Sequence, residues 1–223
     1  MEILLDSANL PAVRRFYDTC PISGLTTNPS ILKKEGKIDF FAHMKELQSV
    51  LAGGDTFHVQ VVGENADDML READVLIEKL SADVYIKVPT TESGLKVMKT
   101  IVKAGHNVTA TAVYSAFQAF LAAEVGVKYI APYFNRMQNL GMRADEEIFA
   151  MASAIDQTET KIVAASFKRI QQVIDAIQAG AEAVTIPTDI LETQFANQTV
   201  NNAVSAFLQD WQSVQGAKNI YEL

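Results

Sequence analysis

Cysteine is almost absent from this sequence, which contains only Cys20 among 223 residues. A single cysteine forms no intrachain disulfide and no cysteine-based metal site. Long apolar runs are also missing, since none approaches the roughly 20 residues that cross a bilayer. The first residues, Met1-Glu2-Ile3-Leu4-Leu5, lack the basic start and long apolar core of a secretory signal. We therefore expect a cytoplasmic protein with no membrane-spanning segment.

Basic residues are in deficit, with 19 Lys and Arg against 27 Asp and Glu, a net charge of -8 and a sequence pI of about 4.9. This balance argues against a general surface for nucleic acid or anionic membranes, although a local basic cluster can still bind a phosphorylated metabolite. With 48% hydrophobic residues, the composition is that of an ordinary globular protein. No linker or low-complexity tract marks a domain boundary, so we predict a single domain over residues 1–223.

Short β-branched runs alternate with segments of helical periodicity along the whole chain. Such alternation leaves two folds open, a closed eight-stranded α/β barrel and an open doubly wound sheet. The number of strands favours the barrel, a (β/α)8 or TIM barrel. The first strand is followed by Asp6-Ser7-Ala8-Asn9-Leu10, without the glycines of a dinucleotide-binding loop. The predicted strands are residues 2–5, 22–26, 56–62, 84–88, 107–112, 129–133, 161–165 and 183–186.

A further amphipathic helix is predicted at about residues 199–215, beyond the helix of the last strand–helix unit. Its apolar residues recur at helical spacing and include Trp211, the sole tryptophan. An apolar stripe of this length must be covered. It either caps its own barrel or reaches a neighbouring subunit, and the sequence leaves both open.

Lys87 is the most unusual residue of the predicted strands, because it interrupts the apolar stretch around Val84-Tyr85-Ile86 and Val88. Lysine is rarely buried, since removing an ammonium from water is costly. A desolvated lysine loses its proton more easily, and the neutral amine is a nucleophile towards carbonyls. The alternative is an edge strand whose lysine points into solvent.

Polar residues gather where the predicted strands end, which in barrels of this kind is where the chemistry lies. Each has an ordinary explanation as well. Asp6 and Asn28 suit helix caps or turns, Thr111 suits any strand, and Gln60 suits the outer face of the sheet. Tyr133 suits the core, and Arg136 and Lys168 suit solvated loops. Their convergence on one end favours a site made of Asp6, Asn28, Gln60, Lys87, Thr111, Tyr133, Arg136 and Lys168.

The histidines give little support for other mechanisms. His43, His58 and His106 show neither zinc-ligand spacing nor a visible triad. His58 shares the strand face of Gln60, and we interpret it as a core or rim histidine. We predict no metal and no cofactor.

Several linked segments resemble the transaldolase family, and the similarity is greatest to the short branch that includes fructose-6-phosphate aldolase. The resemblance covers essentially the whole chain in order. It is carried by Leu25-Thr26-Thr27-Asn28-Pro29-Ser30, Ile86-Lys87-Val88-Pro89, Ala110-Thr111-Ala112-Val113-Tyr114, Ala131-Pro132-Tyr133-Phe134-Asn135-Arg136 and Ala164-Ala165-Ser166-Phe167-Lys168.

The resemblance implies a class I aldolase in which Lys87 forms a Schiff base, with no metal required. It assigns Tyr133 to acid–base work, alone or through a water held by Gln60 and Thr111. Asp6, Thr26, Asn28 and Ser166 then surround the dihydroxyacetone part of the substrate, with Asp6 near the reacting groups. Arg136 and Lys168 match positions that hold the phosphate.

Within the family, transaldolases carry glutamate on the third strand and phenylalanine at the end of the sixth. Gln60 and Tyr133 match the aldolase type instead, and Tyr114 also fits. We therefore expect cleavage and formation of fructose 6-phosphate from dihydroxyacetone and glyceraldehyde 3-phosphate. The alternatives are a transaldolase and a silent barrel that binds sugar phosphates. The resemblance also suggests a homo-oligomer, a pentamer or decamer.

Two features depart from the family pattern and bear on the acceptor aldehyde. The loop after the sixth strand carries Arg143 in a stretch that is otherwise glycine-rich in the family. This arginine either adds a second cation near the phosphate end or shortens the pocket. Thr109, two residues before Thr111, is more polar than the family pattern predicts.

Overall fold

The computed structural model describes residues 1–216 and 218–223. The chain divides into two compact units, Met1–Thr188 (unit 1) and Asp189–Leu223 (unit 2), and each is described by itself.

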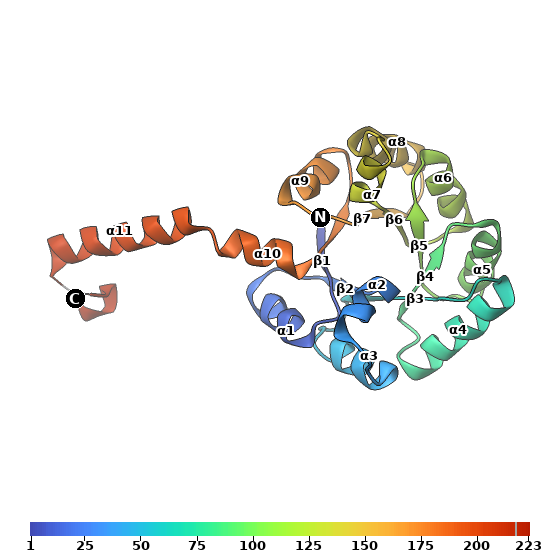
Figure 1. Cartoon of the computed structure of the whole chain (residues 1–223), viewed down its shortest axis with the longest axis horizontal. Coiled ribbons are helices and arrows are strands. Elements are labelled where there is room, and N and C mark those ends of the chain that lie inside the picture. Colours follow the sequence, from blue (N-terminus) through green and yellow to red (C-terminus); the bar gives the residue numbers. More distant parts are fainter. Residues whose placement is uncertain (217) are drawn as a thin grey trace. The chain divides into compact units, whose positions relative to one another are not determined.

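Unit 1 is organised around parallel strands that follow one another in chain order and close into a barrel (Figure 1). The last strand returns to the first, so that Glu2 pairs with Ala183 and Leu5 with Ile186. This closing ladder excludes the open sheet and confirms the predicted barrel. The strands are β1 (Glu2–Asp6), β2 (Gly24–Thr26), β3 (Thr56–Gln60), β4 (Tyr85–Pro89), β5 (Val108–Val113), β6 (Tyr129–Pro132), β7 (Lys161–Ala164) and β8 (Ala183–Ile186).

Helices of unit 1 form a ring outside the barrel (Figure 1). An additional short helix, α7, begins directly after β6, where the sequence suggested only a loop. The helices are α1 (Leu10–Thr19), α2 (Pro29–Leu32), η1 (a 3-10 turn, Lys33–Glu35), α3 (Phe40–Gln48), α4 (Ala66–Lys79), α5 (Glu92–Lys103), α6 (Ala116–Val125), α7 (Phe134–Asn139), α8 (Ala144–Ile155) and α9 (Ile170–Gln178).

Side-chain caps explain where several of these helices begin. Asn9, Asn65, Thr91 and Ser115 each accept a hydrogen bond from the backbone N–H three residues ahead. Gly126 ends α6 in the left-handed conformation, which glycine adopts freely. Local sequence signals thus specify where several helices of the strand–helix alternation begin and end.

A glycine fixes the junction between β4 and α5, next to the strand that carries Lys87. A Cβ at Gly94 would lie 1.8 Å from the carbonyl oxygen of Pro89. Any larger residue would push the start of α5 away from the end of β4. The close approach therefore requires glycine.

The two faces of each strand have different surroundings, because side chains alternate along a strand. Leu5, Ile86 and Val88 are fully buried, and the next residues on either side of them face the barrel interior. Part of that interior is an apolar cluster packed against Tyr85, made of Leu4, Tyr129, Ala131, Val163 and Ala183. The inward positions therefore mix apolar residues with the polar residues of the predicted site.

The predicted strand boundaries lie within two residues of those observed. Residues 183–186 match β8 at both ends, whereas residues 22–26 shrink to Gly24–Thr26 in β2. Strand ends depend on which backbone groups find a partner in the neighbouring strand, and a single strand's sequence does not specify this.

Unit 2 contains α10 (Thr188–Phe195) from Asp189 onward, α11 (Gln198–Gln215) and η2 (a 3-10 turn, Ile220–Glu222). The predicted terminal helix at about residues 199–215 corresponds to α11, which Asn197 caps at its start. No residue of α11 is buried. Its exposed apolar side chains are Val200, Val204, Phe207, Leu208 and Val214. Within residues 1–216 and 218–223, no helix combines the length and apolar character needed to traverse a bilayer.

Candidate active site

Lys87 is buried inside the barrel, with 4% of its surface exposed. Its Nζ donates a 2.8 Å hydrogen bond to the backbone carbonyl oxygen of Thr27. Burial lowers the pKa of Lys87 below the usual lysine value, and the negative charge of Asp6 opposes this effect only partly. The alternative of a lysine pointing into solvent is therefore wrong.

The direction in which Lys87 points follows from the contacts of the neighbouring strands. His58 on β3 and Thr109 on β5 are joined by a 2.8 Å hydrogen bond, although β4 lies between their strands. That bond must cross the barrel interior, and the His58 ring stacks on Tyr85 of β4. Since side chains alternate, Lys87 lies on the inward face two residues beyond Tyr85.

Gln60 is the register partner of Lys87 on β3. It lies two residues beyond His58 and so shares the inward direction, which contradicts the alternative of an outward glutamine. Its Oε1 is buried and has no hydrogen-bond partner among the described residues. A buried amide oxygen in this state is costly unless a water or a ligand donates to it.

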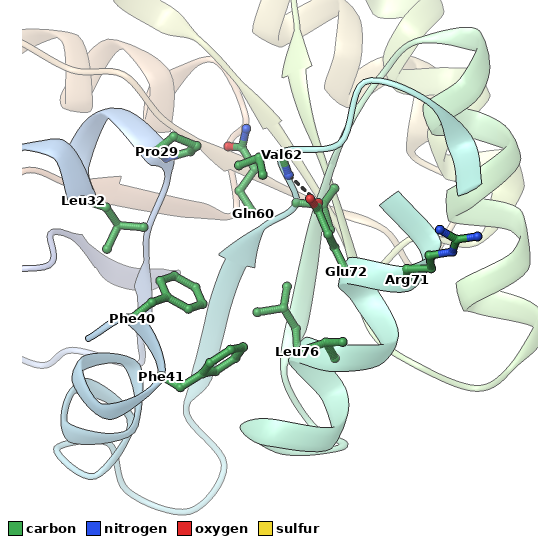
Figure 2. A pocket seen from close by; sticks show the side chains of 11 residues that line it. Pro29, Leu32, Phe40, Phe41, Gln60, Val62, Arg71, Glu72 and Leu76 are labelled. Carbon is green, nitrogen blue, oxygen red and sulfur yellow. Dashed lines mark hydrogen bonds between the residues drawn. The ribbon is translucent and has the colours of Figure 1, made fainter. Parts of the chain in front are cut away.

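The end of β3 is held by a carboxylate from α4. Glu72 Oε2 accepts hydrogen bonds from the backbone N–H groups of Val62 and Gly63, at 2.7 and 2.9 Å. Figure 2 shows the Val62 bond close to Gln60. This anchor fixes the backbone immediately after Gln60.

Thr111 and Tyr133 form a second polar pair, with 2.7 Å between Thr111 Oγ1 and the Tyr133 hydroxyl oxygen. The pKa of Tyr133 is raised, mainly by burial, while Thr111 and the Arg136 charge act in the opposite direction. Arg136 Cζ lies 4.5 Å from the centroid of the Tyr133 ring. The Tyr114 ring meets the Tyr133 ring edge-on, at 5.8 Å between centroids. These contacts fix the position of the Tyr133 hydroxyl, so Tyr133 is not an ordinary core aromatic residue.

Asp6 is placed by the strands next to it. Thr26 donates its hydroxyl to Asp6 Oδ1 at 2.7 Å and lies 2.7 Å from the hydroxyl of Thr185 on β8. The helix that follows β1 is capped by Asn9, so the alternative of Asp6 as a helix cap is wrong. Thr26 is 1% exposed, and its bonds make it a support for the Asp6 carboxylate.

Asn28 and Ser166 are both constrained by the backbone. Asn28 caps α2, and its Oδ1 accepts a hydrogen bond from the Ile31 N–H at 3.0 Å. The alternative of Asn28 as a helix cap is therefore correct for this oxygen. Ser166 adopts a φ of 66°, in the left-handed region, and its carbonyl oxygen accepts from the Asn135 N–H at 3.0 Å. A non-glycine residue in this region is uncommon and concentrates at functional sites.

The two cations of the predicted site are exposed. Arg136 belongs to α7 and Lys168 to the loop after β7. Their exposure is compatible with solvated loop charges and equally with a phosphate bound at the rim. Their role as phosphate ligands stays a prediction.

Two residues that the sequence connected with the acceptor have other partners. The hydroxyl of Thr109 is engaged by His58, which accounts for a polar residue at this position. Arg143 forms an exposed ion pair with Glu146, at 2.8 Å. His58 is a core histidine as predicted, and burial holds its pKa well below the usual value, with a smaller contribution from the Lys87 charge.

Sequence reasoning overlooked the backbone of Thr27 and the side chain of Thr185. Thr27 is held against β3 by its N–H and hydroxyl, both donating to the His58 carbonyl oxygen, at 3.0 and 3.2 Å. Carbonyl groups carry no sequence signal. Thr185 was detectable, since it is a polar residue within a buried strand. In the part of the chain that the structure describes, no group of three His, Cys, Asp or Glu side chains is arranged to hold a metal ion.

The chain that carries this site matches the model of the transaldolase/fructose-6-phosphate aldolase family over residues 3–219. The chain belongs to this family of enzymes.

Two relatives illustrate the range of the family. A "probable fructose-6-phosphate aldolase" of Streptococcus pneumoniae is 39% identical over 222 residues, covering 99% of this chain and 100% of the relative. A "probable transaldolase" of Methanococcus maripaludis is 34% identical over 216 residues, covering 96% and 98%. The chain is therefore similar to relatives that are named for each of the two activities.

Proposed function

We propose that the protein is a class I aldolase that cleaves and forms fructose 6-phosphate, or a close analogue, with dihydroxyacetone and glyceraldehyde 3-phosphate as the other reactants. The observation that carries the proposal is Lys87, buried on a barrel strand with a lowered pKa. A buried lysine costs stability unless its neutral amine is used, and a neutral amine attacks carbonyls.

The first half of the proposed reaction forms a covalent intermediate. Lys87 Nζ attacks the C2 carbonyl of the sugar, and the resulting carbinolamine loses water to give an iminium ion. The Thr27 carbonyl oxygen, which accepts from Nζ in the free enzyme, gives the amine a fixed direction. The Asp6 carboxylate is held by Thr26, and its negative charge acts on Lys87. The same charge favours the positively charged iminium.

The second half breaks the carbon–carbon bond. The phenolate form of Tyr133, directly or through a water held by Gln60 and Thr111, takes the proton of the C4 hydroxyl and becomes the phenol. The C3–C4 electron pair moves towards the iminium nitrogen, leaving an enamine on Lys87 and releasing the aldehyde. Protonation of the enamine at C3 and hydrolysis of the iminium then free dihydroxyacetone. The Oε1 of Gln60, which has no hydrogen-bond partner in the described part of the chain, suits a bound water or hydroxyl.

The remaining residues of the proposed site bind substrate. Asn28 and Ser166 contact hydroxyls of the dihydroxyacetone part, with Thr26 acting through Asp6. Arg136 and Lys168 hold the phosphate, where a guanidinium fork and an ammonium suit a dianion. Neither cation is buried, which suits a phosphate that enters from solvent.

Transaldolase activity is the second candidate, because relatives of that name cover nearly the whole chain. Gln60 and Tyr133 favour the aldolase, as does the 39% identity to the Streptococcus protein. The two activities differ in the fate of the enamine. An aldolase releases dihydroxyacetone, whereas a transaldolase passes it to a second aldehyde.

One assay separates the two candidates. The enzyme is incubated with fructose 6-phosphate, with and without erythrose 4-phosphate, and free dihydroxyacetone is measured. Release without the acceptor is expected. Turnover that strictly requires erythrose 4-phosphate would make the protein a transaldolase. The absence of turnover in both arms, in a folded protein, would leave a sugar-phosphate-binding barrel.

We also propose that the protein is a homo-oligomer, a pentamer or decamer by the family resemblance, in which α11 packs on a neighbouring copy. In support, α11 exposes an apolar stripe. Unit 1 has a groove of matching character between α3 and α4, with a cavity of about 580 Å³ (Figure 2). This α3–α4 groove is lined chiefly by Leu32, Phe40, Phe41, Val62, Val75 and Leu76.

A further inference from the structure

Strand β5 does not run regularly to its end. Its register against β6 shifts between Thr111 and Val113, so that Thr111 pairs with Ala131 and Val113 with Pro132. The residue between them, Ala112, has a φ of 56°. This left-handed conformation in the middle of a bulge is strained for any residue with a Cβ. Among the described residues, only Ser166 is another non-glycine residue with positive φ.

The bulge is held in place from the neighbouring strand. The Thr111 carbonyl oxygen accepts from the N–H and the hydroxyl of Thr90, at 2.9 and 3.0 Å, at the end of β4. Two donors on one carbonyl fix the peptide that joins Thr111 to Ala112. The orientation of the Ala112 N–H is therefore set by the fold and does not depend on a substrate.

Both groups displayed by the bulge act on the same atom. Thr111 Oγ1 lies 2.7 Å from the Tyr133 hydroxyl oxygen, and the backbone of Ala112 acts on the same phenol, since it lowers the pKa of Tyr133. A regular strand would send residues 111 and 112 to opposite faces. The left-handed turn at Ala112 is what brings the side chain of one and the amide of the next to one point.

We propose that Ala112 is a positioning residue of the aldol reaction: its strained bulge holds the Thr111 hydroxyl and its own N–H on the Tyr133 oxygen, as a two-donor cradle for the phenolate. The role in turnover rests on the proposed function, whereas the cradle itself does not.

The chemistry of the cradle differs between the two protonation states of Tyr133. The neutral phenol donates to Thr111 Oγ1 and accepts from Ala112. After Tyr133 has lost its proton, the Thr111 hydroxyl reverses and both groups donate to the phenolate oxygen. Apart from this rotation of one hydroxyl hydrogen, donors that are already in place at a developing negative charge need no rearrangement during the reaction. They offset the burial that disfavours the charged form.

Charged and titratable neighbours of Tyr133 add to this balance from other elements. Arg136 on α7 lies over the ring and favours the phenolate, while the Tyr114 side chain disfavours it. The effects of Arg136 and Tyr114 on the ionisation of Tyr133 do not depend on Ala112. Substitutions at Ala112 therefore test the cradle separately from Arg136 and Tyr114.

The choice of variants follows from the backbone. Glycine adopts the left-handed conformation freely, so Ala112→Gly should keep the bulge. A β-branched residue disfavours it strongly, so Ala112→Val should flatten or displace the bulge. Thr111→Val removes the other donor with little change of shape, and it serves if Ala112→Val does not fold.

The experiment reads the ionisation of residue 133 directly, without substrate. Tyr133 is replaced by 3,5-difluorotyrosine, whose fluorines bring the ionisation into the range where the protein is folded, and it is titrated by ¹⁹F resonance. We expect the midpoint to rise by about one to two pH units in Ala112→Val and in Thr111→Val, since a lost hydrogen bond to a charged group has that size. Ala112→Gly should keep the midpoint of the parent protein.

Unchanged midpoints in folded Ala112→Val or Thr111→Val would overturn the cradle, whatever the activity. If the parent protein has no aldol or transaldol turnover but the midpoints shift as expected, the proposed function fails and the cradle stands. With turnover present, the acid limb of kcat should move to higher pH in Ala112→Val and return in Ala112→Gly. A change in thermal stability alone, with the midpoint fixed, would reduce Ala112 to a purely structural residue.

Discussion

The Nζ of Lys87 lies 2.8 Å from the backbone carbonyl oxygen of Thr27, to which it donates a hydrogen bond. A carbonyl accepts from a neutral amine as well as from an ammonium, so this bond orients Nζ without requiring the charge. A carboxylate in the same place would stabilise the ammonium and raise the pKa of the lysine. Thr27 therefore suits a lysine that has to react as a neutral amine.

Lys87→Met should remove turnover, because no other buried amine lies on the strand. Borohydride reduction with dihydroxyacetone should trap an adduct on Lys87 of the parent protein, detected by peptide mass spectrometry. Lys161→Met is the matched control: Glu2 raises the pKa of Lys161, so that amine stays protonated and unreactive. An adduct that persists in Lys87→Met, or is lost in Lys161→Met, would contradict the assignment.

Stability should depend on pH through the same lysine. The pKa of Lys87 is lower in the folded than in the unfolded chain. Between these two values the unfolded state binds more protons, so the free energy of unfolding rises with pH, by at most about 1.4 kcal/mol per pH unit. Lys87→Met should lack this increment. Urea unfolding of both proteins at several pH values up to 10.5, the ordinary lysine value, measures it; parallel curves would sink the idea.

Tyr133→Phe should lower kcat by about 10²- to 10⁴-fold, the usual contribution of a positioned acid or base. The Schiff base should still form, because Lys87 attacks before Tyr133 is needed. Borohydride trapping with fructose 6-phosphate, together with the kinetics, separates the two steps. Loss of trapping along with turnover would move Tyr133 from proton transfer to the formation of the site.

Arg136→Gln should lower kcat/KM for fructose 6-phosphate by about 10- to 100-fold, since hydrogen bonds to charged groups are worth about 1.5–3 kcal/mol. Lys168→Gln should act in the same direction. For unphosphorylated fructose both effects should be much smaller. Arg143→Gln is the control, because Arg143 is paired with Glu146. Equal losses on both substrates would exclude a phosphate role for Arg136.

Phe207→Asp combined with Val204→Asp should reduce the assembly to smaller species, measured by light scattering at micromolar concentration. Both side chains are exposed on α11, and carboxylates would prevent their burial at an interface. A control exchange, Gln198→Asp, is made at the first residue of the same helix. A parent protein that is monomeric at this concentration would rule out the homo-oligomer.

The barrel could be predicted because its signals are local. Each strand is a short β-branched run, and caps such as Asn65 and Ser115 mark where helices begin. Closure of the barrel was an inference from the number of strands, and the pairing of Glu2 with Ala183 decided it. The short helix α7 escaped notice, because six residues from Phe134 to Asn139 carry too little periodicity.

The site could be predicted as a set of residues but not as a set of contacts. Thr109 seemed to bear on the substrate, yet its hydroxyl belongs to His58 across β4. Arg143 seemed to bear on the acceptor, either as a second cation near the phosphate end or by shortening the pocket, and its partner is Glu146. Such pairings join residues far apart in sequence, so no local pattern contains them.

The sequence by itself determined the strand–helix alternation, the apolar setting of Lys87 and the polar residues at the strand ends, since these depend on residue type and spacing. The tertiary structure alone decided that Lys87 points inward to the Thr27 carbonyl and that, among the described residues, a buried oxygen of Gln60 has no hydrogen-bond partner. It alone also showed the left-handed bulge at Ala112. These features arise from strand register and burial, which exist only when distant segments pack together.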